Sequence, residues 1–165
     1  MFITGVGTAA PAQRYSQRDC WEALQGSKQF AGLNLRARAI LKKVLTGNTG
    51  IATRHLALES LDQAFLLSAD ALHERFARQA PLLAIQAAQN ALHDAHTRAD
   101  EIDALIISTC TGYLCPGLTS YVSEKLGLRS EVLGLDLVGQ GCGAAIPNLR
   151  TGEALLAAQR CRRVL

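Results

Sequence analysis

Residues 132–145 read VLGLDLVGQGCGAA, a run in which a predicted strand, a turn and a predicted helix meet. The apolar strand pattern ends at Val138, a glycine-rich corner containing Cys142 follows, and small residues begin the helix. A helix N-terminus carries partial positive charge and unpaired N–H groups, which favour a thiolate and hold a developing oxyanion. We therefore expect Cys142 to be a nucleophile, with Gly141 and Gly143 letting a bulky acyl group approach the main chain.

Two other interpretations of this corner stay open. A free cysteine is often a buried and inert core residue. Residues 139–144 also fit the G-x-G-x-x-A dinucleotide pattern, which needs an acidic residue about 20 positions later. Residues 159–163 contain no acid, and a second match at residues 5–10 runs directly into Pro11, so the pattern is a poor fit in both places.

The composition is that of a globular chain. Its 165 residues are 48% hydrophobic and 19% charged, with a formal net charge of +3. We expect no nucleic acid partner from so mild a charge, and no apolar run has the length that spans a membrane. The N-terminus lacks the basic segment of a secretory signal, which favours a cytoplasmic location. There the five cysteines would be free thiols rather than disulfides.

Predicted strands and helices alternate along the chain. The predicted strands are short apolar runs at residues 2–6, 104–109 and 132–138. The predicted helices have helical hydrophobic spacing and cover residues 16–26, 37–47, 68–96, 118–126 and 143–159. Pro81 must kink or break the third of these, giving one long helix or two. The alternation predicts an α/β fold with a mostly parallel sheet covered by helices.

The last residues, 162–165, read as the opening of a further strand. We therefore expect residues 1–165 to be one half-domain, truncated at the start of that strand, of a natural polypeptide that is longer.

The helix predicted at residues 37–47 has a basic face. The cations on this face are Arg36, Arg38, Lys42 and Lys43. Both a solvated surface and a phosphate site fit such a pattern.

Residues 110–117 read CTGYLCPG and are predicted to form a loop, because glycine and the Pro-Gly pair interrupt regular structure. Cys110 and Cys115 would also suit a zinc site or a redox pair. A structural zinc site needs four ligands, and only His93 and His96 offer a second pair. These histidines lie on a solvated helix face, so we expect no metal.

The loop at residues 110–117 and the corner at residues 139–145 together carry a family resemblance. Their order and spacing resemble the N-terminal half of the type III polyketide synthases, the chalcone and stilbene synthase family of the thiolase fold. The resemblance implies the first half of the duplicated βαβαβ thiolase fold. It also implies an acyltransferase that loads a starter acyl group from coenzyme A on Cys142. The group is then extended by decarboxylative Claisen condensation with malonyl-CoA to a chalcone, resorcinol or pyrone type of polyketide.

The resemblance assigns further residues around the cysteine. Cys110 and Thr111 match cavity-lining positions. Cys115 matches a position, usually methionine, that reaches across a dimer interface into the partner's cavity, which implies a homodimer.

Coenzyme A binding also follows from the resemblance. Lys43 matches a ligand of the coenzyme A phosphates, and Lys42 and Arg54 are further candidates, which favours the phosphate interpretation of the basic face. Acyl-CoA and malonyl-CoA are the implied substrates, with no cofactor. The family completes its site with a histidine and an asparagine from the C-terminal half, so a 165-residue piece is expected to lack most condensing activity.

Two rival functions remain. A condensing enzyme of the initiating ketoacyl synthase III type has a similar corner with a different tunnel. A non-catalytic half-domain would only bind coenzyme A or dimerise.

Overall fold

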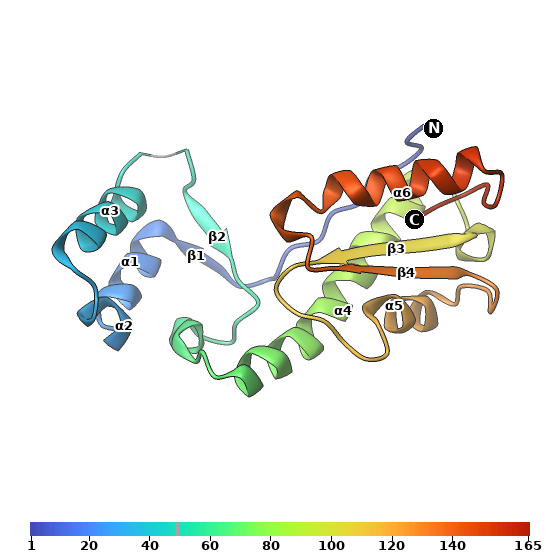
Figure 1. Ribbon diagram of the computed structural model, residues 1–165. Helices are drawn as coiled ribbons and strands as arrows, with labels where there is room; N and C mark the ends of the chain where they lie inside the picture. Colours follow the sequence, from blue (N-terminus) through green and yellow to red (C-terminus); the bar gives the residue numbers. More distant parts are fainter. Residues whose placement is uncertain (49) are drawn as a thin grey trace. The chain divides into compact units, whose positions relative to one another are not determined.

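The computed structural model describes residues 1–48 and 50–165 (Figure 1). The chain folds into two compact units, one of residues 1–9 and 76–165 and one of residues 10–75. The division falls within the longest helix, α4 (Ala69–Asp94). Pro81 lies inside this continuous helix, so the alternative of two separate helices is wrong.

The unit of residues 10–75 combines helices with a two-stranded antiparallel ribbon, which the sequence pattern did not predict. Strand β1 (Arg14–Ser16) pairs with β2 (Thr53–His55). The helices of this unit are α1 (Gln17–Gln25), α2 (Lys28–Ala31), α3 (Leu35–Thr46) and the 3-10 helix η1 (Leu61–Phe65). Helix α1 begins at a capping box of Ser16 and Asp19, and α3 ends at Gly47, both close to the predicted positions.

The other unit is built on two parallel strands, as the apolar runs predict. Strand β3 (Ala104–Thr109) pairs with β4 (Leu133–Val138), and α5 (Leu118–Leu126) connects them. Helix α6 (Ala145–Ala157) follows β4. Val164 forms a parallel bridge with Ala104, so the chain end runs beside β3 as expected for the opening of a strand.

The two faces of this sheet are covered by different helices. Leu105 packs with Ala88 of α4 and with Leu118 and Val122 of α5, and these buried residues form the core cluster. Ile106 points to the opposite face, where its side chain lies near Gly152 of α6. Two turns connect the helices to the sheet, the 3-10 helices η2 (Ala99–Glu101) and η3 (Gly141–Gly143). Of the helices in the part of the chain that the structure describes, none is both long and apolar enough to cross a membrane.

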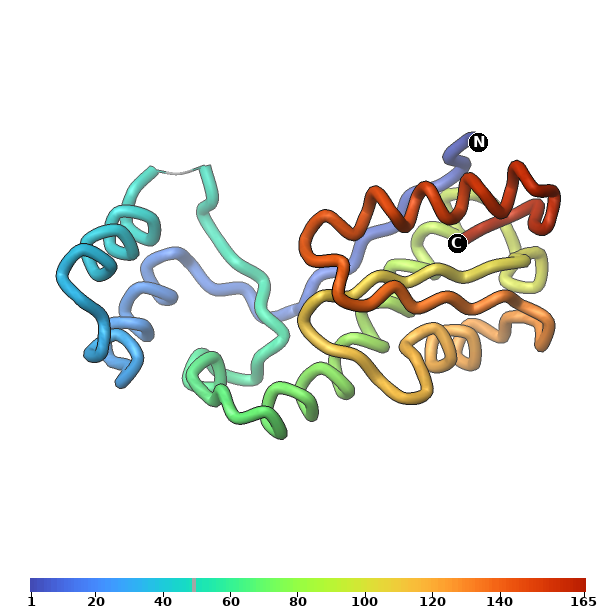
Figure 2. Tube along the Cα trace, viewed as in Figure 1, coloured from blue at the N-terminus to red at the C-terminus, as the bar shows by residue number. Residues whose placement is uncertain are grey.

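The N-terminal segment, residues 1–9, follows α4 without forming a strand (Figure 2), so the strand predicted at residues 2–6 is wrong. Its polar main-chain groups bind helix side chains instead of a neighbouring strand. Val6 N donates to Asp94 Oδ2 at 2.9 Å, and Asn90 Nδ2 donates to Thr8 O at 2.9 Å. Apolar alternation alone did not reveal that the partner of this segment is a helix.

Gly7→Ala is expected to destabilise this unit. A Cβ at Gly7 would lie 2.1 Å from Ala87 O and 2.2 Å from Ala91 N, so the segment must move away from α4. We expect a loss of about 2 kcal/mol in the free energy of unfolding, measured by urea denaturation. Gly152→Ala is the matched control, because its Cβ would meet only Val164 Cγ1 at 3.5 Å and Ile106 Cδ1 at 3.8 Å, and helix propensity favours alanine. Equal stability of the two variants would contradict the close packing of the segment.

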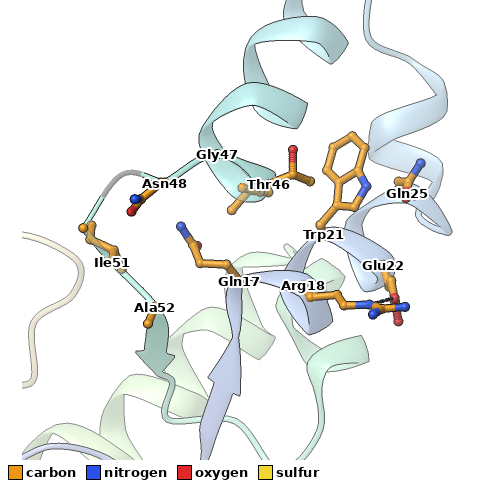
Figure 3. Close-up of a pocket in the computed structure, with 12 residues that line it drawn as sticks. Gln17, Arg18, Trp21, Glu22, Gln25, Thr46, Gly47, Asn48, Ile51 and Ala52 are labelled. Atoms are coloured by element: carbon orange, nitrogen blue, oxygen red, sulfur yellow. Dashed lines mark hydrogen bonds and ion pairs between the residues drawn. The ribbon is translucent and has the colours of Figure 1, made fainter.

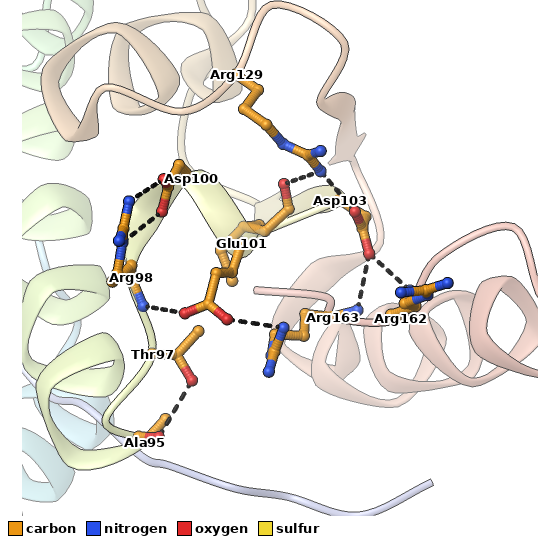
Figure 4. A network of polar contacts seen from close by, with 10 residues as sticks. Ala95, Thr97, Arg98, Asp100, Glu101, Asp103, Arg129, Arg162 and Arg163 are labelled. Carbon is orange, nitrogen blue, oxygen red and sulfur yellow. Dashed lines mark hydrogen bonds and ion pairs between the residues drawn. The ribbon is translucent and has the colours of Figure 1, made fainter.

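Asp103 connects the start of β3 to the end of the chain (Figure 4). Its Oδ2 accepts hydrogen bonds from Arg162 N at 2.7 Å and Arg163 N at 3.1 Å, and its Oδ1 accepts from Arg129 Nη2 at 2.6 Å. The N–H of Arg162, followed by that of Arg163 and the Arg129 side chain, holds the pKa of Asp103 below its ordinary value against the opposing effect of burial.

This carboxylate makes stability depend on pH. Because its folded pKa is below the unfolded value of about 3.9, its contribution is present above that value and is lost as pH falls through the folded pKa. We expect Asp103→Asn to lose about 1 to 2 kcal/mol at pH 7 and to flatten the acid limb of a stability profile measured by urea denaturation. Glu153→Gln, an exposed acid on α6, serves as control. If Asp103→Asn lost stability at low pH as steeply as the parent protein, Asp103 would not be the source of this pH dependence.

Candidate functional site

Cys142 is exposed on the single turn η3, between the end of β4 and the start of α6. The predicted strand-turn-helix corner is therefore present. Helix α6 has Ala144 at its N-cap, and no side chain caps its first turn, while Ala144 N donates to Gly141 O at 3.2 Å. Main-chain N–H groups at a helix start are of the kind that hold a developing oxyanion when a thiolate attacks a thioester.

Two glycines of the corner adopt left-handed backbone conformations. Gly139 has φ +80° and Gly141 has φ +67°, a region that residues with a Cβ rarely adopt. Gly143 needs no such conformation, and a Cβ there would meet nothing within 4 Å. The two glycines predicted to contact substrate, Gly141 and Gly143, therefore differ: the backbone conformation requires glycine at position 141 but not at position 143.

Helix α6 is held on the sheet by a polar contact close to the corner. Asn148 Nδ2 donates to Ile106 O and to Ser108 Oγ, each at 3.3 Å. Gly139 N donates to Thr109 O at 3.2 Å and so extends the β3–β4 ladder into the turn. The strand and the helix that flank Cys142 are therefore both tied to β3.

The loop at residues 110–117 emerges at the same end of the sheet as the Cys142 corner (Figure 2). Thr109, the last residue of β3, pairs with Val138, the last residue of β4, so the two connections leave neighbouring parallel strands side by side. Cys110, Thr111 and Cys115 are all exposed on this loop. The structure thus brings the predicted cavity-lining residues and the predicted nucleophile to one edge, the usual location of ligand sites in α/β sheets.

The loop of residues 110–117 is held by contacts with β3 and α4. Thr109 Oγ1 donates to Gly112 O at 2.8 Å. A Cβ at Gly112 would lie 2.6 Å from the ring of Phe76, so the loop packs closely on α4. Within residues 1–48 and 50–165, no group of three His, Cys, Asp or Glu side chains is placed to hold a metal ion. Geometry therefore lends no support to a zinc site at Cys110 and Cys115.

The other cysteines differ from Cys142 in environment. Cys20 is half-buried on α1 and Cys161 is buried after α6. Burial raises the pKa of both thiols, which makes them poorer nucleophiles at neutral pH. These two residues are therefore useful internal references for thiol reactivity.

The candidate coenzyme A residues lie in the unit of residues 10–75. Lys42 and Lys43 are exposed on α3. Arg54 is half-buried on β2, and its Nε donates to Gln17 Oε1 at 3.0 Å. The two lysines therefore present their charges to solvent, whereas Arg54 is already bound to a neighbouring side chain.

A cavity of about 680 Å³ opens in the same unit, beside α1 and the end of α3 (Figure 3). Trp21, Thr46 and Ile51 supply part of its lining, and an ion pair of Arg18 and Glu22 lies at its edge. Lys42, Lys43 and Arg54 are not among its described lining residues. Sequence patterns did not reveal this cavity, since it forms where two segments about 30 residues apart approach each other.

Comparison with known proteins supports the resemblance found in the sequence. Residues 2–165 match the family model described as chalcone and stilbene synthases, N-terminal domain. The 1,3,6,8-tetrahydroxynaphthalene synthase of Streptomyces peucetius subsp. caesius is 32% identical over 145 residues, which are 87% of this chain and 37% of that enzyme.

Solved structures show the same fold. A type III pentaketide synthase from Neurospora crassa superposes with a TM-score of 0.79 at 26% identity, over 96% of this chain and 41% of that one. The C-terminal type III polyketide synthase domain of Steely1 from Dictyostelium superposes with a TM-score of 0.81 at 24% identity. The match covers 95% of this chain and 44% of that one. The predicted thiolase-like α/β fold is therefore confirmed, and the chain spans less than half the length of each of these relatives.

Proposed function

Because the chain belongs to the chalcone and stilbene synthase family, we propose that residues 1–165 form the N-terminal half-domain of an acyltransferase of the type III polyketide synthase kind. The observation that carries this proposal is the exposed Cys142 on a left-handed glycine corner at the uncapped start of α6. The whole enzyme would load a starter acyl group and extend it with malonyl-CoA. The family match favours this function over a ketoacyl synthase III type of enzyme.

In the loading step, Cys142 is the nucleophile and the start of α6 binds the oxyanion. The Cys142 thiolate attacks the thioester carbonyl carbon of an acyl-CoA, and the negative charge moves to the carbonyl oxygen. The N–H groups at the start of α6 would bind that oxygen. Collapse of the tetrahedral intermediate expels coenzyme A as a thiolate and leaves the acyl group as a thioester on Cys142.

The condensation step requires further groups. Malonyl-CoA loses carbon dioxide, its α-carbon forms a bond to the acyl carbonyl carbon, and the Cys142 thiolate leaves. His93 lies in the last turn of α4 and His96 in the turn after it, on the way to the start of β3, whereas Cys142 follows the end of β4. The placement of these two histidines supports the expectation that the catalytic histidine comes from elsewhere in the whole enzyme.

We further propose a homodimer in which the exposed Cys115 lines the partner's cavity, and a cytoplasmic location. Acyl-CoA and malonyl-CoA are the proposed substrates, and no cofactor takes part.

The experiment that tests the proposal is mass spectrometry of the intact full-length protein after incubation with a panel of acyl-CoAs. We expect a mass increase of one acyl group, located on Cys142 by peptide mapping. The absence of any adduct in the folded protein would instead support a non-catalytic, coenzyme A binding or dimerising half-domain. A dimer mass in native mass spectrometry would test the oligomeric state in the same sample.

Lys43→Glu is expected to weaken binding of acyl-CoA. If Lys43 contacts the phosphates, reversing its charge raises the half-saturating acyl-CoA concentration for loading by about tenfold. Loading from the acyl thioester of N-acetylcysteamine, which has no phosphates, should not change. Lys125→Glu, an exposed lysine on α5, is the matched control. An equal effect of Lys43→Glu on both thioesters would contradict a phosphate contact.

A further inference from the structure

Strand β4 contains a carboxylate at a position where its neighbours are apolar. Asp136 lies opposite Ile107 in the parallel register, six residues before Cys142. Leu135 and Leu137 flank it. Its side chain is half-buried on the face of the sheet that α5 covers, where Gly134 also approaches Thr119 of that helix. A carboxylate at such a position needs hydrogen-bond partners to offset the loss of water.

Both oxygens of Asp136 bind the start of α5. Oδ1 accepts a hydrogen bond from Thr119 N at 3.2 Å, and Oδ2 accepts from Thr119 Oγ1 at 2.5 Å. Thr119 is only 5% exposed. The N-cap residue of α5 is Gly117, which has no side chain and so makes no side-chain cap hydrogen bond. Asp136 on strand β4 therefore caps helix α5, a role that a Ser, Thr, Asp or Asn at the N-cap itself usually performs.

The close approach extends to the Pro-Gly end of the loop. A Cβ at Gly117 would lie 2.1 Å from Asp136 Oδ2, so the main chain passes directly against the carboxylate. Only glycine fits at this position while Asp136 keeps its place. Gly117 and Asp136 are thus two parts of one contact.

Strand β4 consequently holds the loop of residues 110–117 at both ends. The beginning of the loop is held by the pairing of Thr109 with Val138, and its end is held by the contact of Asp136 with Gly117 and Thr119. The same strand continues into the Cys142 corner. Cys110 and Thr111, the predicted cavity-lining residues of the loop, therefore take their positions relative to Cys142 from this strand, and Cys115, two residues before Gly117, is held by the same contact.

We propose that Asp136 is a positioning residue that clamps the end of the 110–117 loop to β4, and that this clamp sets which acyl groups fit beside Cys142. The inference rests on the proposed function for its second part, since the acyl group is the ligand that the loop would contact. The clamp itself rests on the hydrogen bonds and the close contact at Gly117.

The test compares Asp136→Leu, Asp136→Asn and Thr119→Val in the full-length protein. Leucine removes both hydrogen bonds, and valine removes only the hydroxyl bond at constant shape. Asparagine retains size and hydrogen-bonding capacity, so it is expected to restore most of the parent behaviour. Thr119→Val keeps the test informative if Asp136→Leu does not fold.

The first readouts do not depend on acyl loading. We expect Asp136→Leu to raise hydrogen exchange at the amides of Thr119 and Ser120 and to change the alkylation rate of Cys115 by at least about fivefold, with Cys20 and Cys161 unaffected. The second readout is the ratio of loading rates for acetyl-CoA and octanoyl-CoA. We expect this ratio to shift by at least about fivefold in Asp136→Leu and by less in Thr119→Val.

The outcomes separate the clamp from the proposed function. A folded Asp136→Leu with unchanged Cys115 alkylation, unchanged exchange and an unchanged acetyl to octanoyl ratio would overturn the inference. So would a uniform loss of loading in proportion to the folded fraction, because that is the effect of a purely structural residue. A parent protein that loads no acyl group refutes the proposed function and the specificity role together, while exchange and Cys115 alkylation still decide whether the clamp exists.

Discussion

Cys142→Ala is expected to lower the rate of acyl loading from every acyl-CoA by about 10³-fold or more, which is the scale expected when a covalent nucleophile is removed. Alanine has no group that can form a thioester, and the exposed corner should keep its fold because the side chain packs against little. The measurement is intact-protein mass spectrometry with a time course of adduct formation.

The matched control for this variant is Cys20→Ala. Cys20 is a half-buried thiol of raised pKa on α1, so its removal should leave loading near the parent rate. A persistent adduct in Cys142→Ala, located on Cys110 or Cys115, would mean that the nucleophile lies on the 110–117 loop and that the corner has another role.

Gly141→Ala should also slow loading strongly, although it removes no reacting atom. At φ +67° a Cβ costs about 1 to 2 kcal/mol, and the turn can avoid that cost only by changing its backbone. Either response displaces Cys142 from the start of α6. We expect the loading rate to fall by about tenfold or more. The urea midpoint of unfolding should fall too little to explain this loss by unfolding.

Gly143→Ala provides the comparison for Gly141→Ala. Its position needs no left-handed conformation and offers open space, so the substitution should slow loading less. If both variants loaded at the same reduced rate, the loss would reflect crowding of the acyl group rather than backbone conformation.

Most local structure followed from sequence patterns. The uninterrupted apolar run at residues 104–109 and the mainly apolar run at residues 132–138 became the paired strands β3 and β4. The capping box at Ser16 and Asp19 marked the start of α1. These predictions succeed because strand burial and helix capping depend on residues within a few positions of one another.

The failures involve segments whose partners are distant in sequence. Residues 2–6 have a strand-like pattern, yet Gly5 and Gly7 pack against α4. The short strands β1 and β2 have no strong pattern of their own and exist because they pair with each other across about 40 residues. Pairing partners of this kind cannot be read from local periodicity.

The same division holds at the candidate site. The sequence alone marked Cys142, its glycines and the 110–117 loop as candidates, because a strand, a glycine turn and a helix start are local signals. Their meeting at one edge of the sheet required the parallel register of β3 and β4. The clamp of Asp136 on Thr119 and Gly117 joins residues 17 and 19 positions apart through hydrogen bonds that only packing of α5 on β4 creates. Such contacts depend on which elements pack together, and that choice is made by the burial of the whole apolar surface rather than by any single segment.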